Sequence, residues 1–275
     1  MWTLSGFADE IDPDLDVQCR LLDELGIANM EFRSAWDTNV LDLDDAQLDR
    51  VRDTVARHGI RVSSIGSPIG KIGITEDFPS HLDRFRRALA VAERLEAPVV
   101  RVFSFFIPAG TDPDSYRDEV LRRMSAIADA ARGHGVVLAH ENEKEIYGDI
   151  PRRCADLVES VGSEQLRLTW DSANFVQCGV RPHTEGFELL RPYLEYVQIK
   201  DAVAATGKVV PAGAGDGEVR ETLTALRDDG FDGVFSLEPH LGTVDGAVAH
   251  TGGELFSTAA RAFTGLLDEL HITYC

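Results

Sequence analysis

Residues 136–142 read Val-Val-Leu-Ala-His-Glu-Asn, a short apolar run that ends abruptly in polar groups, among them the carboxylate of Glu141. Apolar runs of this length, rich in Val and Leu, are typical of buried strands. Three later stretches repeat the design, at residues 166–171, 196–201 and 233–240. A β/α barrel keeps its chemistry at the C-terminal ends of its strands. The pattern therefore predicts a site built from these four strand ends.

The rest of the chain alternates short apolar runs with segments of helical spacing. Further strands are expected at residues 3–8, 29–33, 60–65 and 99–106, and helices at residues 15–25, 48–58, 82–95, 115–133, 150–161, 186–190, 219–229 and 253–270. Eight alternations, spaced roughly 30 residues apart as βα units are, predict an α/β protein with a (β/α)8 TIM barrel in one domain spanning 1–275. An open doubly wound sheet is disfavoured, because the turn after the first strand is not glycine-rich.

Composition narrows the class of protein. The chain has 275 residues, 44% of them hydrophobic, and a formal net charge of −20. Such a charge repels nucleic acid and anionic membranes, so neither is an expected partner. The four cysteines form no CxxC pair, the N-terminus lacks the features of a signal peptide, and no apolar run approaches the ~20 residues that span a bilayer. A soluble cytoplasmic protein is the expectation.

Four polar side chains are the first candidates for the site. Side chains two residues apart share a face of a strand, and Glu141, Asp171, Gln198 and Glu238 converge at the barrel mouth if their faces point inward. Three carboxylates there would repel one another and raise their pKa values unless a cation compensates. Oxygen ligands favour Mg²⁺ or Mn²⁺ over Zn²⁺. One divalent metal ion is therefore predicted.

These motifs resemble those of the sugar phosphate isomerase/epimerase family, which has a xylose isomerase-like barrel, and of its inosose dehydratase and ketose 3-epimerase branches. The segments that carry the resemblance are His140–Asp149, Trp170–Asn174, Tyr196–Asp201 and Ser236–His240. The resemblance implies that Glu141, Asp171 and Glu238 ligate the metal. Much of the family has histidine as the fourth ligand, where this chain has Gln198. Mn²⁺ or Mg²⁺ is expected, with Co²⁺ or Zn²⁺ as alternatives.

The chemistry that the resemblance implies is proton abstraction next to a carbonyl through a metal-bound enediolate. Glu141 and Glu238 would be the catalytic pair, one removing the proton and the other returning it. The substrate would be a small sugar, polyol or sugar phosphate, and the protein could form a homodimer. The alternatives are an inosose-type dehydratase on the same metal site and a non-catalytic sugar-binding protein. A nuclease with several zinc ions and many histidine ligands is disfavoured by the charge.

Seven further side chains are candidates for substrate binding: Lys200, His240, Asn174, Tyr147, Arg101, Glu31 and Lys71. For three of them the alternative to substrate binding is a structural role. Lys200 would instead form an ion pair with Glu141 or Asp201, Arg101 would form a salt bridge inside the barrel or with Glu31, and Lys71 would be solvated. Tyr147 would close over a sugar, and Asn174 stands where the epimerases usually have histidine. His140 and Trp170 alternate away from the site and are expected to pack under helices.

Overall fold

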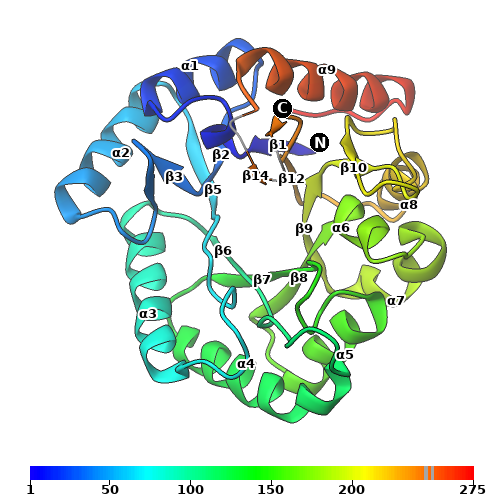
Figure 1. Cartoon of the computed structure of the whole chain (residues 1–275). Helices are drawn as coiled ribbons and strands as arrows, with labels where there is room; N and C mark the ends of the chain where they lie inside the picture. The colour runs from blue at the N-terminus through cyan, green and yellow to red at the C-terminus, as the bar shows by residue number, and fades with distance from the viewer. Residues whose placement is uncertain (245–246, 249–250) are drawn as a thin grey trace.

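Eight parallel strands line the centre of the protein (Figure 1). The computed structural model describes residues 1–244, 247–248 and 251–275. In chain order the strands are β1 (Thr3–Gly6), β2 (Asn29–Phe32), β5 (Arg61–Ile65), β6 (Val99–Val102), β7 (Val137–Glu141), β8 (Leu166–Asp171), β9 (Leu194–Ile199) and β12 (Val234–Leu237). Their spatial order is β1-β12-β9-β8-β7-β6-β5-β2. Parallel neighbours that are mostly consecutive in the chain are the signature of a β/α barrel.

The two ends of this order lie side by side and nearly close the barrel. The side chain of Asn29 on β2 donates a hydrogen bond to the backbone oxygen of Leu4 on β1, at 3.0 Å. Ser5 on β1 and Ser63 on β5 are joined by a hydroxyl–hydroxyl contact of 2.7 Å. Side-chain hydrogen bonds therefore bridge the seam. The predicted (β/α)8 barrel is confirmed.

The helices form a ring outside the strands (Figure 1). They are α1 (Leu15–Glu24), α2 (Asp45–Arg57), α3 (Phe78–Arg94), α4 (Arg117–Ala131), α5 (Pro151–Val161), α6 (Ser172–Gln177), α7 (Glu188–Leu190), α8 (Val219–Asp228) and α9 (Gly253–Glu269). Aspartates at the N-caps of α1, α2 and α3 accept backbone hydrogen bonds from the first turn, which stabilises these helix starts. The apolar faces of the helices pack against the strands in one main core.

Short elements complete the loops. Two-stranded hairpins pair β3 (Ser34–Ala35) with β4 (Thr38–Asn39), β10 (Asp201–Ala202) with β11 (Val209–Val210), and β13 (Thr243–Val244) with β14 (Ala247–Val248). The 3-10 turns are Ala8–Glu10, Pro113–Tyr116 and Arg191–Tyr193, and a π-helical turn spans His183–Phe187. Within the described ranges, no helix has the length and apolarity needed to cross a membrane.

Two expected elements differ in the structure, and several elements were not expected. The strand expected at residues 99–106 ends at Val102, and the helix expected at residues 186–190 is a π-helical turn followed by α7. Helix α6 and the hairpins were not predicted. Helix α6 was not predicted because no loop separates it from β8. Asp171 is the last residue of the strand and also the N-cap of the helix, where its side chain accepts a hydrogen bond from the Asn174 amide at 2.8 Å.

The loop after β5 carries Lys71 and is fixed by Gly70 and His81. Gly70 has φ +91° and lies so close to the Phe103 backbone that a Cβ would come within 2.0 Å of the Phe103 oxygen. Its amide donates to Nε2 of buried His81 on α3, at 2.7 Å. This nitrogen must be unprotonated to accept the bond. Burial, aided by the charges of Arg84 and Arg123, lowers the pKa of His81 to about 4.

We expect His81 to make the fold less stable below neutral pH. An unfolded histidine, with a pKa near 6.5, takes up a proton that the folded state refuses until about pH 4. The free energy of unfolding should therefore fall by about 1–2 kcal/mol more between pH 7 and pH 5 in the wild type than in His81→Gln, which keeps an acceptor. Urea unfolding at the two pH values measures this. Equal pH dependence in both proteins would contradict it.

Candidate functional site

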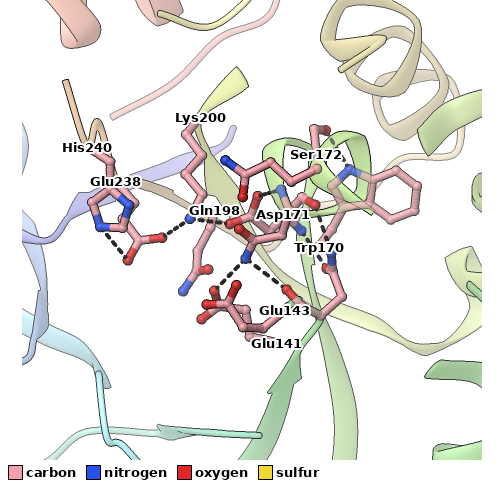
Figure 2. A network of polar contacts seen from close by, with 12 residues as sticks. Glu141, Glu143, Trp170, Asp171, Ser172, Gln198, Lys200, Glu238 and His240 are labelled. Carbon is pink, nitrogen blue, oxygen red and sulfur yellow. Dashed lines mark hydrogen bonds and ion pairs between the residues drawn. The ribbon is translucent and has the colours of Figure 1, made fainter. Parts of the chain in front are cut away.

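Three carboxylates from three strands meet at the C-terminal mouth of the barrel. Glu141 ends β7, Asp171 ends β8, and Glu238 directly follows β12. One oxygen from each lies within 4.8 Å of the other two, and all three side chains are buried. Figure 2 shows them pointing toward a common space. The structure thus brings together the three acidic residues that the sequence singled out.

Basic side chains already neutralise this cluster. The ammonium of Lys200 lies 2.8 Å from Asp171 Oδ2 and 2.7 Å from Glu238 Oε2 (Figure 2). Arg101 on β6 lies 3.0 Å from Glu141 and 3.7 Å from Glu238. The salt bridge expected for Arg101 inside the barrel is confirmed. The ion pair considered for Lys200, with Glu141 or Asp201, is wrong, because Lys200 instead joins two carboxylates.

The three carboxylates have different environments. Burial raises the pKa of Glu141, against the opposing charge of Arg101. Burial also raises the pKa of Asp171 to about 7, against the opposing charge of Lys200. Burial acts on Glu238 in the same direction, but the combined charges of Lys200, Arg101 and Arg33 hold its pKa well below its usual range. Glu238 is therefore the most strongly ionised member of the cluster.

Gln198 is the fourth side chain that the sequence assigned to the metal. It lies on β9, level with Asp171 on β8 and Ser236 on β12, and is buried. Its Nε2 donates to Glu31 Oε1 at 3.4 Å, whereas its Oε1 has no hydrogen-bond partner in the described part of the chain. A buried acceptor without a donor is unfavourable by about 1–3 kcal/mol. A cation at the cluster would satisfy it.

The donor set fits a hard divalent cation. Three carboxylates and an amide oxygen are the ligand types that Mg²⁺ and Mn²⁺ prefer. The ammonium of Lys200 would compete with such an ion, because it already contacts the carboxylates of Asp171 and Glu238, two of the groups that would ligate the ion. Metal binding at this cluster therefore requires Lys200 to give up at least part of these contacts.

A second group, formed by Glu10, Glu238 and His240, adjoins the first. The sequence had singled out Glu238 and His240 but not Glu10. Nε2 of His240 lies 3.4 Å from Glu10 Oε1 and 3.4 Å from Glu238 Oε1. Arg33 lies 2.7 Å from Asp9 and 3.1 Å from Glu238. Burial raises the pKa of Glu10 to about 7 and lowers that of His240 to about 3. The sequence offered one signal for this group. Asp9 and Glu10 follow the first strand, whose C-terminal end lies at the same mouth of the barrel.

The remaining candidates divide between the site and its surroundings. Asn174 on α6 donates to Glu141 Oε1 at 3.1 Å and so contacts the cluster. Lys71 pairs with Glu143 at 3.2 Å and lies over the Phe103 ring, so it is not simply solvated.

Tyr147 is not brought to the cluster. Its ring is buried in the core and its hydroxyl donates to Asp156 Oδ2 on α5, at 2.7 Å. The expectation that it closes over a sugar does not fit this position, because the side chain turns outward to the helix layer. His140 and Trp170 are buried, His140 against Ser104 and Trp170 against Phe175, as the alternation predicted.

Comparison with known proteins identifies the family. The family model described as "Xylose isomerase-like TIM barrel" matches residues 19–256. The chain belongs to this family. A curated relative, the 2-epi-5-epi-valiolone 7-phosphate 2-epimerase of Actinoplanes sp., is 35% identical over 162 residues, which are 59% of this chain and 58% of the relative. The match thus spans less than two thirds of that relative's own length.

Solved structures share the fold of this chain at low sequence identity. The IOLI protein with a bound zinc atom superposes with a TM-score of 0.79 at 17% identity, covering 98% of this chain and 99% of that one. The probable 3-DHS dehydratase AsbF from Bacillus anthracis superposes with a TM-score of 0.74 at 17% identity, covering 96% and 98%. The resemblance seen in the sequence motifs is confirmed at the level of family and fold.

We expect Arg101→Met to destabilise the protein by about 3–5 kcal/mol, because it leaves buried Glu141 and Glu238 without a cation that they contact. The matched control is Arg84→Met. Arg84 pairs with Asp42 in solvent, their side chains being 39% and 51% exposed. Its loss should change the free energy of unfolding by less than about 1 kcal/mol. Urea unfolding compares the two variants, and equal losses would contradict the importance assigned to Arg101.

Proposed function

We propose that this protein is a divalent-metal-dependent isomerase or epimerase that acts on a sugar, a polyol ketone or a sugar phosphate by proton abstraction next to a carbonyl. The observation that carries the proposal is the convergence of Glu141, Asp171 and Glu238, with carboxylate oxygens within 4.8 Å, at the C-terminal ends of the strands. Barrel enzymes hold their catalytic groups at this end. The name of the curated relative, a 2-epimerase, supports the reaction class.

The ligands proposed for the ion are Glu141, Asp171, Gln198 and Glu238. One Mn²⁺ or Mg²⁺ fits their oxygen donors best. When bound, the ion would supply a Lewis acid that polarises the substrate carbonyl and makes the neighbouring C–H bond more acidic. All four side chains are buried, and in a site with little water their electrostatic interactions with a bound substrate would be strong.

The proton transfers are assigned to Glu141 and Glu238. They come from β7 and β12, which β8 and β9 separate in the barrel, so they approach the shared space from different sides. One carboxylate would remove the proton and the other would return it. Return to the same carbon gives epimerisation, and return to its neighbour gives isomerisation. Asn174 would orient Glu141 through its 3.1 Å hydrogen bond.

Exchange of substrate hydrogen with solvent tests the reaction class. We expect the wild type with Mn²⁺ to incorporate deuterium from heavy water into a member of a panel of free and phosphorylated ketoses and cyclic polyol ketones. Glu141→Gln and Glu238→Gln should each slow exchange by about 10²–10⁴-fold, the usual contribution of a positioned acid or base. NMR follows the exchange.

The control for exchange is Glu195→Gln, at the opposite end of β9, where the side chain is 40% exposed and exchange should be unchanged. Loss of water from the substrate would move the assignment to a dehydratase. Ligand binding without any exchange would favour a sugar-binding protein and contradict the proposal.

Lys200→Met should bind Mn²⁺ more tightly than the wild type, by roughly tenfold or more, since each 1.4 kcal/mol of relieved competition is a factor of ten. Isothermal calorimetry measures the dissociation constant. Lys144→Met is the control, because Lys144 is half exposed near the mouth and lies 3.7 Å from Glu143, outside the cluster. Unchanged or weaker binding in Lys200→Met would show that the ion does not share Asp171 and Glu238 with Lys200.

A further inference from the structure

Gln198 differs from the other three proposed ligands because its amide has two unlike ends. The carbonyl oxygen can bind a cation, whereas the NH₂ group can only donate hydrogen bonds. A carboxylate presents oxygen whichever way it is turned. An amide that serves as a metal ligand must therefore be held in one of two orientations. Histidine ligands face the same requirement, and it is met by a hydrogen bond from the ring nitrogen that does not bind the metal.

A hydrogen bond between Gln198 and Glu31 selects one of the two orientations of the amide. Nε2 of Gln198 donates to Glu31 Oε1 on β2, at 3.4 Å. Oε1 of Gln198 is buried and accepts no hydrogen bond from the residues that the structure describes. In the reversed orientation the amide oxygen would face Glu31 Oε1, which also accepts a hydrogen bond from Ser64, so that one acceptor would face another. The observed orientation thus leaves the one atom that can bind a cation unpaired.

Glu31 is itself placed for this contact. It is buried on β2 and receives a long hydrogen bond from Ser64 on β5, at 3.4 Å. The pairing of β2 with β5 shifts register between Met30 and Glu31, so that Glu31 lies opposite Ser64. An irregularity of this kind redirects the side chain that follows it. The carboxylate of Glu31 thereby reaches Gln198 on β9, which is not a neighbour of β2 in the sheet.

We propose that Glu31 is a positioning residue that fixes the amide of Gln198 with its oxygen available to the metal. The inference rests on the proposed function, in which Gln198 is the fourth ligand. Glu31 then contacts the ligand rather than the substrate, in place of the substrate-binding role that the sequence suggested.

A double-mutant cycle tests the inference. The Glu31→Gln substitution keeps the size of the side chain but lets it present either an acceptor or a donor to Gln198. We expect the dissociation constant for Mn²⁺, measured by calorimetry, to rise about 10–100-fold, as it does when a partner of a metal ligand is lost. In a Gln198→Glu background the ligand has two equivalent oxygens, and Glu31→Gln should then weaken Mn²⁺ binding by less than about twofold.

Two controls separate orientation from a general structural effect. Urea unfolding in the absence of metal should show that Glu31→Gln is folded and at least as stable as the wild type, because the substitution removes a buried ionisable group. Ser64→Ala removes the hydrogen bond from Ser64 to Glu31 and should change the Mn²⁺ dissociation constant less than Glu31→Gln does.

Three results would overturn the inference, and they are distinguishable. If Glu31→Gln leaves Mn²⁺ binding within about twofold of the wild type, Glu31 does not orient Gln198, while the proposed function stands. If Glu31→Gln weakens binding equally in both backgrounds, its effect is not orientation of the amide. If the wild type binds none of Mn²⁺, Mg²⁺, Co²⁺ and Zn²⁺, the proposed function fails and this inference fails with it.

Discussion

The structure depends on the balance of charge inside the barrel mouth. Moving an ion out of water costs several kcal/mol even after the protein relaxes, so a buried carboxylate persists only with a partner. Glu141, Asp171 and Glu238 are all buried within contact distance of Lys200 or Arg101. Glu238 contacts more of these cations than the other two carboxylates do, because Arg33 also lies 3.1 Å from it. These ion pairs join β6, β7, β8, β9 and β12 at one end of the barrel.

The same constraint prepares the site for chemistry. A bare cluster of three carboxylates would resist full ionisation, but the resident cations hold Glu238 ionised while Asp171 and Glu141 remain easier to protonate. Neighbouring acids with divergent pKa values are typical of sites that move protons. A divalent ion would enter a site already adjusted to positive charge, in competition with Lys200. Metal affinity and fold stability are therefore coupled through the carboxylates of Asp171 and Glu238, which Lys200 joins.

Much of this arrangement is present in the sequence as local pattern. Alternation of apolar runs and helical segments predicted the barrel, and the polar ends of β7, β8, β9 and β12 predicted the convergence of Glu141, Asp171 and Glu238. The partners of these acids were less predictable. Lys200 pairs with residues that lie 29 and 38 positions away in the chain, on other strands, and no local spacing distinguishes them from Glu141 or Asp201.

Residues outside the strands were the hardest to place. Glu10 lies in a 3-10 turn and Arg33 just past β2, and their roles depend on how the loops fold over the mouth. Tyr147 was misassigned for the opposite reason: proximity in sequence to Glu141 says nothing about direction once the chain leaves the strand. Asp171 is both the last residue of β8 and the N-cap of α6, so no break in the sequence separates the strand from the helix.

The most direct test of the central claim is anomalous diffraction from crystals grown with Mn²⁺. We predict one peak per chain, with Glu141, Asp171, Gln198 and Glu238 as its protein ligands, and Lys200 displaced from at least one of its two carboxylates. A peak held instead by Glu10, Glu238 and His240, a second group among the described residues that could ligate an ion, would contradict this account. So would the absence of a peak at saturating Mn²⁺, with Lys200 still joining Asp171 to Glu238.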